Sequence, residues 1–354
     1  MTILLCLLAG LVLGVIAERV IGVRTPAPEG QPGATATAPA PKRPKKKRRV
    51  GRIIAWTSVL LVALLIAGAT FVYLRAKSIF DDIEKVPVAA QLSDDTSNGT
   101  NYLLVGADNA TNEDGEAREG IAGARADTIM VLNINGDKAK MLSLNRDLWV
   151  ANPATGENGR LNATYRDGPS NLIQAVTENF GIPINHYIEI DFVSFGGLVD
   201  AFGGIDINFA HPAFDLASGL DVKQSGLVHL DGKQALAFVR SRHYAEVIDG
   251  EVVLDLTSDL GRVQRQQVFL RAIMKKAGAS RNPFTLMKAA DNMSNGLRID
   301  DTMTMWEAGR FAWDMGKLEP VSIVLPVTGR TTSGGAAVLD LDQPAADLVL
   351  NQFR

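Results

Sequence analysis

The stretch that decides the fold runs from Val239 to Gln267. It begins V-R-S-R-H-Y, continues through a polar and acidic loop, and ends D-L-G-R-V-Q-R-Q-Q. Arg240 and Arg242 follow a short apolar run, 237–239, which we interpret as the end of a strand. Side chains two residues apart on a strand leave the same face, so these two guanidiniums would form one site for an anion.

The second half of this stretch predicts a helix with two kinds of face. At 100° per residue, Asp259, Arg262 and Gln266 fall within about a sixth of a turn of one another, and Arg265 stands at the edge of that sector. From 269 to 277 the helix becomes apolar at helical spacing, which predicts that it docks on a core and points its polar first turns into a pocket. Buried arginines need an anionic partner, and phosphate fits the planar guanidinium. The alternative is that the arginines pair with the acidic residues around them.

Charge is unevenly distributed along the 354 residues. Residues 42–52 hold eight basic side chains and no acid, whereas from Ser78 onward 24 Lys and Arg residues stand against 37 Asp and Glu residues, a net charge of −13. This larger part is too acidic for a general nucleic-acid surface, so we expect no nucleic-acid partner.

The basic segment is followed by residues 53–74, which carry no charge and are long enough to cross a bilayer. Basic residues mark the cytoplasmic end of a span, so residues 42–52 are predicted to lie inside the cell and everything after Arg75 outside it. Residues 1–23 form a second apolar segment, either a possible first transmembrane helix or an artefact of the start site. The single cysteine, Cys6, lies there, so we expect no disulfide in the exported part.

The sequence therefore predicts five parts. They are an apolar segment (1–23), a Pro/Ala linker with the basic cytoplasmic segment (24–52), a transmembrane helix (53–74), a stem and connector (75–97) and one folded domain (98–354).

Charged residues follow or precede three strands predicted at the start of the domain. The strands are 102–105, 129–134 and 140–144, and the charged residues are Asp108, then Arg125 with Asp127, then Arg146 with Asp147. If the strands are neighbours, carboxylates and arginines meet at one edge of a sheet, which is the composition of a Mg²⁺ and phosphate site. Each aspartate has the alternative role of capping a turn.

Strands and helices alternate through the rest of the chain, which predicts one α/β domain. We expect helices at 170–180, 192–202, 283–293, 302–315 and 343–353, and strands at 186–191, 205–208, 321–325 and 336–339. The sequence contains no P-loop, no G-x-S-x-G elbow and no zinc motif. His186 and His243 are therefore interpreted as structural.

Seven sequence blocks together resemble the LytR-CpsA-Psr family. They are G-A-D-N (106–109), R-A-D-T (125–128), N-R-D (145–147), R-L-N-A-T-Y (160–165), L-V-D-A-F-G-G-I-D-I (198–207), L-D-G-K-Q-A-L-A-F-V-R-S-R (230–242) and D-L-G-R-V-Q-R-Q-Q (259–267). The blocks occur in the family's order and cover about 98–354. The resemblance implies a domain of the family's type, with a mixed central sheet flanked by helices, on the extracytoplasmic side of the cell membrane.

The resemblance also implies an activity. Members of this family take a glycopolymer from a polyprenyl-pyrophosphate carrier and attach it to peptidoglycan through a phosphodiester. Two alternatives remain open from the sequence. One is a polyprenyl-pyrophosphate phosphatase that uses water as the acceptor, and the other is a non-enzymatic regulator that binds the lipid pyrophosphate.

By the family pattern, Mg²⁺ is the expected cofactor, and the site residues fall into three groups. The metal ligands would be Asp108 and Asp127; the catalytic residues would be Arg125, Arg146 and Asp127; and the pyrophosphate-binding residues would be Arg125, Arg146, Arg240, Arg242, Asp259, Arg262, Arg265 and Gln266. Asp127 and Asp147 are both candidates for the general base. An apolar slot beside the helix that begins at Phe192 would hold the polyprenyl tail.

Two positions differ from the family pattern. Asn109-Ala110 replaces a frequent Ser-Arg, so one phosphate-binding arginine is missing, and Asn145 replaces a frequent proline before Arg146. The difference at Asn109-Ala110 affects how that end of the pyrophosphate is held. The difference at Asn145 is conservative in role.

Overall fold

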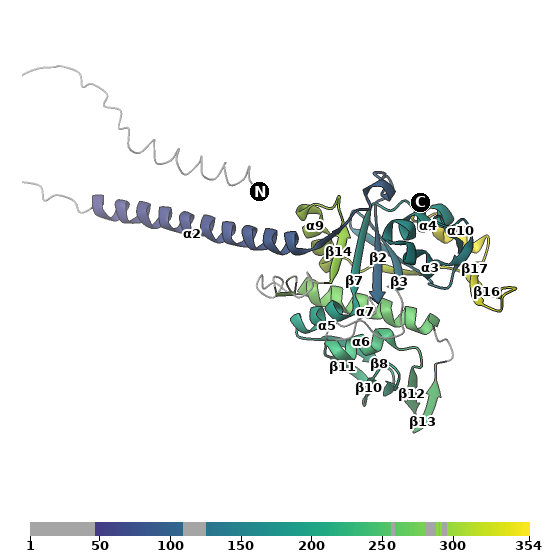
Figure 1. Cartoon of the computed structure of the whole chain (residues 1–354). Coiled ribbons are helices and arrows are strands. Elements are labelled where there is room, and N and C mark those ends of the chain that lie inside the picture. Colours follow the sequence, from purple (N-terminus) through teal and green to yellow (C-terminus); the bar gives the residue numbers. More distant parts are fainter. Residues whose placement is uncertain (1–46, 109–124, 256–258, 280–287, 290, 292–295) are drawn as a thin grey trace, which may run out of the picture. The chain divides into compact units, whose positions relative to one another are not determined.

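The computed structural model describes residues 47–108, 125–255, 259–279, 288–289, 291 and 296–354. The first apolar segment, the Pro/Ala linker, Asn109-Ala110 and most of the helix expected at 283–293 lie outside the described residues. The chain divides into two compact units, Met1–Ala63 and Leu64–Arg354, and the second unit holds the folded domain (Figure 1).

Helix α2 (Lys47–Asp82) contains the predicted transmembrane segment. Within the described part of the chain, one segment, Gly51–Asp82, is long and apolar enough to cross a membrane. Every side chain from Ile53 to Leu74 is exposed. A helix that is apolar on all sides fits a lipid environment rather than water.

The domain is built on a mixed sheet of seven strands in the order β1-β14-β7-β2-β3-β4-β15. β2, β3 and β4 form an antiparallel meander, whereas β7 joins β2, and β15 joins β4, in parallel. The strands are β1 (Glu84–Val86), β2 (Thr100–Asp108), β3 (Arg125–Asn135), β4 (Lys138–Leu144), β7 (His186–Asp191), β14 (Leu297–Asp300) and β15 (Val321–Val324). The predicted mixed central sheet is confirmed, and five of the predicted strands belong to it. The strands predicted at 205–208 and 336–339 are β8 and β17, which lie in separate two-stranded sheets.

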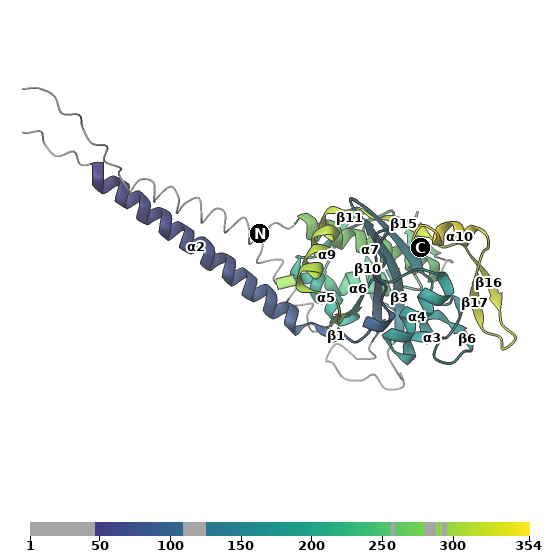
Figure 2. The ribbon, with the colours of Figure 1, turned by 90° about the horizontal axis from the view of Figure 1, so that it is seen from above.

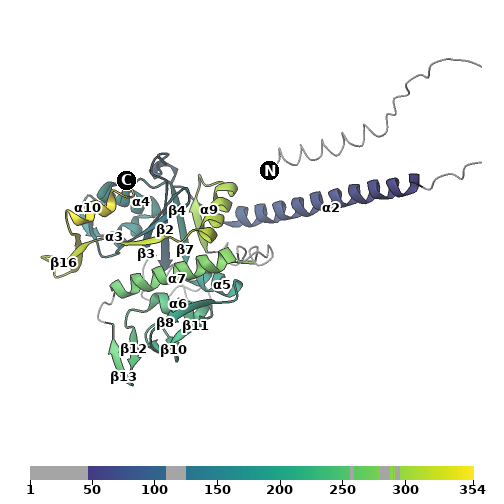
Figure 3. The same ribbon diagram turned by 180° about the vertical axis from the view of Figure 1, so that it is seen from behind.

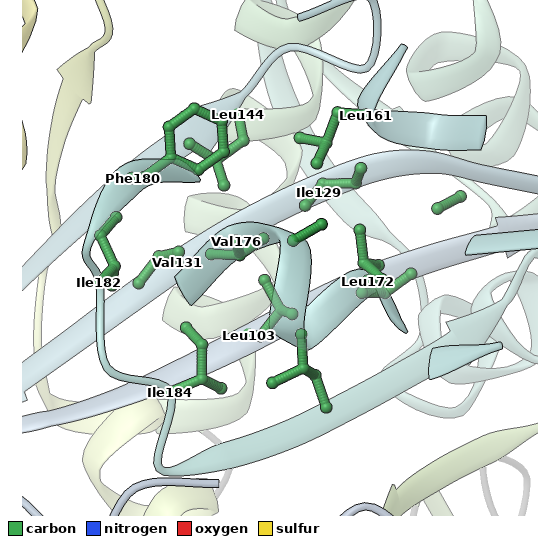
Figure 4. Close-up of a cluster of buried hydrophobic side chains, with 14 of the residues drawn as sticks. Leu103, Ile129, Val131, Leu144, Leu161, Leu172, Val176, Phe180, Ile182 and Ile184 are labelled. Carbon is green, nitrogen blue, oxygen red and sulfur yellow. The ribbon is translucent and has the colours of Figure 1, made fainter. Parts of the chain in front are cut away.

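The two faces of this sheet pack on two different cores, because alternate residues of a strand point to opposite faces. Leu103 and Val131 belong to the core that α3 (Leu161–Thr164) and α4 (Pro169–Phe180) cover, as Figure 4 shows. Tyr102 and Leu132, their neighbours on the same strands, belong to the core on the other face. Helices α7 (Asp259–Ala279) and α9 (Met305–Lys317) contribute to that second core.

A third core lies under α7 on its side away from the sheet. It contains buried side chains from α5, α6, α7 and the antiparallel pair of strands β8 and β11. Figures 1 and 3 show α7 running between the central sheet and this lower part. The elements of the lower part are α5 (Phe192–Ala201), β8 (Ile205–Phe209), β9 (Ala213–Asp215), β10 (Leu220–Val222), β11 (Gly226–Leu230), α6 (Gly232–Arg240), β12 (Ala245–Ile248) and β13 (Glu251–Leu254).

The remaining elements are short. They are η1 (Ala89–Gln91), β5 (Trp149–Ala151), β6 (Asn158–Arg160), η2 (Tyr165–Asp167), β16 (Val327–Thr331), β17 (Ala337–Leu341) and α10 (Ala345–Leu350). Figure 2 shows the β16–β17 hairpin and α9 at opposite ends of the domain.

The segment that we expected to be a connector, 75–97, contributes a strand to the sheet. β1 pairs with β14, and the register places Arg298 opposite Glu84 on one side and opposite Glu189 on the other. The Arg298 guanidinium lies 3.0 Å from the Glu84 carboxylate and 3.1 Å from that of Glu189, which is fully buried. A buried carboxylate would be costly without this partner. The ion pairs that Arg298 makes with Glu84 and Glu189 therefore attach the end of the connector to the sheet.

Two predictions in the organising stretch are wrong. Residues 237–239 are part of helix α6, not of a strand. Asp231 is the N-cap of this helix and accepts a hydrogen bond from the backbone N–H of Gln234. The loop after it is a β-hairpin, β12 and β13, because Asp249 and Gly250 both adopt a positive φ and form the tight turn that twisted strands require.

The close approach of α5 and α6 requires Gly232. A methyl group there would stand 2.3 Å from the carbonyl oxygen of Gly196, so the helices would have to separate. We expect Gly232→Ala to lower the free energy of unfolding by about 1–3 kcal/mol. The matched control is Gly309→Ala on α9, where no atom lies within 4 Å; it should raise stability by up to about 1 kcal/mol. Thermal unfolding of both variants tests this, and equal stability would contradict it.

Candidate functional site

The three strand ends that carry charged residues do meet at one edge of the central sheet. Asp108, the last residue of β2, stands opposite Arg125, the first residue of β3, and Leu144 at the end of β4 stands opposite Ile129. The β2–β3 register shifts between Gly106 and Ala107 and skips Asp127. The backbone therefore places Asp127 in a β-bulge at this edge of the sheet.

Arg146 and Asp147 lie two and three residues after the end of β4 and are partly exposed. The Asp147 carboxylate lies 3.6 Å from the Arg146 guanidinium and 3.2 Å from that of Arg160. Asn145, which is buried, accepts a hydrogen bond from the backbone N–H of Asp147 at 2.9 Å. The asparagine that replaces the family's proline thus forms the turn on which Arg146 stands.

Arg240 and Arg242 stand on either side of Ser241, at the C-terminal end of α6. The turn 241–243, here called the Ser241 turn, is bound by the buried carboxylate of Asp215. One oxygen of Asp215 accepts hydrogen bonds from the Ser241 hydroxyl at 2.7 Å and from the backbone N–H groups of Arg242 and His243 at 3.0 Å each. Both arginines therefore extend from a turn whose backbone is fixed.

The other oxygen of Asp215 accepts from the backbone N–H groups of Ala217 and Ser218. Burial alone would raise the pKa of Asp215. The hydrogen bonds from Ser241, His243, Ala217 and Ser218 outweigh burial and lower its pKa to about 2. The group is thus a permanent carboxylate near neutral pH, with donors at both oxygens.

Helix α7 carries the other predicted binding residues on its first turns. Arg262 is 2% exposed and Gln266 is 7% exposed, which confirms that a polar face of this helix is buried. The backbone of Asp259 forms the first residue of the helix. The apolar residues after it are buried as expected; Phe269 and Ile273 belong to the lower core.

Arg265 connects α7 to the Ser241 turn. Its guanidinium donates to the Ser241 carbonyl oxygen at 2.9 Å and to the Asp255 carboxylate at 2.8 Å, and it lies 4.6 Å from the Tyr244 ring centre. Pairing with an acid of the intervening segment was the alternative considered for each arginine, and it holds for Arg265. This side chain positions the turn that carries Arg240 and Arg242.

Gln267 connects α7 to the edge of the central sheet. Its side-chain amide donates to the Ser143 hydroxyl at 2.9 Å, and both groups are buried. Ser143 lies on β4, three residues before Arg146. One helix therefore binds the Ser241 turn and the end of β4, and brings together the segments that carry Arg240, Arg242, Arg262, Gln266 and Arg146.

The two histidines that the sequence marked as structural occupy different places, because His186 lies on β7 and His243 is part of the Ser241 turn. His186 pairs with the buried carboxylate of Asp300 at 3.1 Å and stacks on Tyr102. His243 is exposed, and its backbone N–H is one of the donors to Asp215. Sequence reasoning missed Asp215 itself. The only local signal for it is the turn that its side chain forms with the next residues.

The fold and the site define an α/β domain with an arginine-rich site at one edge of a mixed sheet. The model of the LytR_cpsA_psr family matches residues 70–354. This chain belongs to the LytR-CpsA-Psr family.

Individual relatives agree with this assignment. The chain is 33% identical over 270 residues to the probable cell wall biosynthesis protein LcpB of Corynebacterium glutamicum, across 72% of this chain and 61% of that protein. It is 30% identical over 270 residues to the polyisoprenyl-teichoic acid–peptidoglycan teichoic acid transferase TagU of Enterococcus faecalis, across 73% of this chain and 82% of that protein. A solved LytR-Csp2A-Psr enzyme from Actinomyces oris superposes with a TM-score of 0.63 at 25% identity, across 77% of this chain and 96% of that one.

We expect Asp215→Asn to lower the free energy of unfolding and to loosen the Ser241 turn. The amide would turn an N–H toward the donors of the Ser241 turn, and a buried unsatisfied donor costs about 1–3 kcal/mol. The matched control is Asp221→Asn, an exposed carboxylate that pairs with Lys223. Thermal unfolding of the two variants and the native chain measures the difference, and a variant as stable as the control would contradict the role assigned to Asp215.

The stabilisation from Asp215 also predicts a pH dependence. The pKa of Asp215 is lowered in the folded state, so its contribution is fully present above the unfolded value near 3.9 and is lost as the pH falls toward about 2. The difference in unfolding temperature between the native chain and Asp215→Asn should therefore shrink between pH 4 and pH 2. A difference that stays constant across this range would argue against it.

Proposed function

We propose that this protein is a membrane-anchored phosphotransferase that moves a glycopolymer from a polyprenyl-pyrophosphate carrier to peptidoglycan through a phosphodiester bond. The observation that carries the proposal is the double attachment of α7, to the Ser241 turn and to β4. This attachment links the segments that carry Arg240, Arg242 and Arg262 to the end of β4, which belongs to the same sheet as the strands that bear Asp108 and Asp127. The printed function of TagU, a transferase of polyisoprenyl-linked teichoic acid to peptidoglycan, supports the same reaction class.

In this reaction a sugar hydroxyl of peptidoglycan attacks the phosphorus that bears the glycopolymer. A new P–O bond forms to that hydroxyl oxygen, and the P–O bond to the polyprenyl phosphate breaks. The leaving group carries away the bond's electron pair, and the hydroxyl proton passes to a base. Catalysis of this kind depends on positioning and on stabilising the negative charge of the phosphoryl oxygens. Arg125, Arg146, Arg240, Arg242 and Arg262 would do this, with Gln266 as a neutral donor.

Two carboxylates were candidates for the base. Asp147 lies between the guanidiniums of Arg146 and Arg160, a position that suits it to orienting Arg146. Asp127, in the bulge of β3, remains the candidate that receives the proton.

The donor set at the sheet edge fits a magnesium ion. Mg²⁺ in phosphate sites binds through one or two carboxylates together with oxygens of the substrate. Asp108 and Asp127 lie on neighbouring strands at that edge, so they would hold the ion. The bound ion would neutralise charge on the pyrophosphate.

The same proposal places the protein in the cell membrane, with the folded domain on the extracytoplasmic side. The basic residues that precede the apolar part of α2 would remain in the cytoplasm. The carrier lipid and the anchor would then share one bilayer.

Arg240→Ala and Arg262→Ala should each lower transfer by about 10²–10³-fold, because each removes a guanidinium that stabilises transition-state charge. The matched control is Arg330→Ala, on the β16–β17 hairpin, which should leave transfer unchanged. The assay uses the full chain in lipid nanodiscs with a short polyprenyl-pyrophosphate oligosaccharide, Mg²⁺ and peptidoglycan fragments, and it follows polyprenyl phosphate and the sugar–phosphate product.

The same assay separates the candidate reactions. A sugar–phosphate link that forms only with peptidoglycan fragments supports the transferase. Release of phosphate without dependence on the acceptor would indicate a phosphatase. Tight binding of the lipid with no turnover would indicate a binding regulator.

Removal of the metal gives a further prediction. A chelator should abolish transfer and added Mg²⁺ should restore it. Asp108→Asn should raise the Mg²⁺ concentration needed for half-maximal transfer by about tenfold or more, because it removes a charged ligand. Asp137→Asn, in the turn between β3 and β4, is the control. Full transfer in the presence of the chelator would rule out a metal role.

A further inference from the structure

Helix α9 presents two different faces. The inner face, with Phe311 and Met315, packs on the core that it shares with the sheet. On the outer face Trp306 and Trp313 are each 67% exposed. Large exposed aromatic side chains on a helix whose other face packs on a core mark a surface that meets something else.

The two tryptophans are part of an ordered arrangement. At 100° per residue, Trp306, Arg310, Trp313 and Lys317 fall within a sector of about 60°. The Arg310 side chain is 82% exposed and lies 3.7 Å from Asp314, and the Lys317 ammonium lies 5.6 Å from the Trp313 ring centre. We call these four side chains the α9 outer face. Indoles alternating with cations are typical of helices that lie in a membrane interface.

Helix α9 packs beside the C-terminal end of α2, the helix that contains the predicted transmembrane segment. Phe80 and Ile83, at and just after the last turn of α2, pack in the same core as Phe311 and Met315. β1 begins at Glu84 and pairs with β14, the strand that leads into α9. Figures 1 to 3 agree that α9 lies beside the C-terminal end of α2.

Only a short part of α2 separates the end of its uncharged segment from the end of the helix. The uncharged segment ends at Leu74 and the helix ends at Asp82, a rise of about 12 Å at 1.5 Å per residue. The headgroup layer on each side of a bilayer is about 5–8 Å thick. The core that α9 shares with the end of α2 thus begins close to the membrane surface.

We propose that the α9 outer face rests on the outer surface of the membrane that α2 crosses, with Trp306 and Trp313 in the headgroup layer and Arg310 and Lys317 against anionic lipid phosphates. This inference rests on the membrane placement given under the proposed function. The contact holds the domain against the bilayer that contains the carrier lipid.

Tryptophan fluorescence can test this directly, because the chain has four tryptophans at known places. Three variants of the full chain each keep one tryptophan and replace the others by Phe. Trp56 lies in the apolar segment of α2 and reports the anchor. Trp313 reports the α9 outer face. Trp149, on β5, is the control, since β5 adjoins β17 on the side of the domain away from α9 (Figure 2).

The variants are reconstituted in vesicles of phosphatidylcholine and phosphatidylglycerol, with and without phosphatidylcholine brominated near the headgroup end of its acyl chains. Trp56 and Trp313 should each lose about half of their emission to the brominated lipid, and Trp149 should keep its emission. Quenching of Trp56 with none at Trp313 would overturn the inference and leave the anchor in place. If Trp56 also kept its emission, α2 would not lie in the bilayer, and both the membrane placement and this inference would be wrong.

Charge reversal supplies the second readout. Arg310→Glu with Lys317→Glu should reduce the quenching of Trp313 by about twofold or more in vesicles rich in phosphatidylglycerol, because the reversed charges repel anionic headgroups. Lys223→Glu with Lys233→Glu, on the lower part of the domain, should have no effect. A Trp313 signal that instead changed with soluble peptidoglycan fragments, or with protein concentration, would assign this face to a glycan or to a second copy and would overturn the inference.

Discussion

Two hydrogen bonds made by neighbouring residues of α7 determine how the parts of this domain meet. Arg265 binds the Ser241 carbonyl and Gln267 binds the Ser143 hydroxyl. Both bonds are buried, so losing either partner would leave a polar group unsatisfied in the interior, which costs more than the bond itself contributes. The apolar residues that follow them on α7 supply packing energy, but they do not fix the rotation of the helix about its axis. The polar pair fixes which face of the helix meets the sheet edge and which meets the Ser241 turn.

The Ser241 turn illustrates how a cationic site can be kept rigid. Arg240 and Arg242 have long, flexible side chains, and a fixed backbone is needed if they are to approach a phosphate at a set distance. Asp215 supplies three of the bonds that fix it and Arg265 supplies a fourth from the opposite side. Because both oxygens of Asp215 are already occupied by donors, this carboxylate does not compete with a phosphate for the neighbouring guanidiniums.

The sequence predicted the strand ends and the character of α7 because both depend on local patterns. Alternation and apolar runs located β2, β3 and β4, and helical spacing located the buried face of α7. The error at α6 came from three apolar residues, 237–239, which suit a strand and a buried helix equally; the capping pair Asp231 and Gln234 was the signal that separates them. In the same way, Asp249-Gly250 was the signal for the hairpin. The role of Asp215 could not be predicted, since its partners at 241–243 are distant in sequence and meet it only in the folded chain.

The junction between α2 and the sheet bears on the proposed reaction. One residue, Ile83, separates the end of α2 from the start of β1, and its side chain packs in the core beneath α9. Glu84 is then bound to Arg298, which is bound in turn to buried Glu189. A flexible spacer would allow a domain to sample many heights above a membrane, whereas a strand paired within the sheet permits few. A polyprenyl carrier presents its pyrophosphate at one height, that of the headgroups. A short, ordered junction is therefore the arrangement that keeps a site of this kind within reach of its lipid substrate.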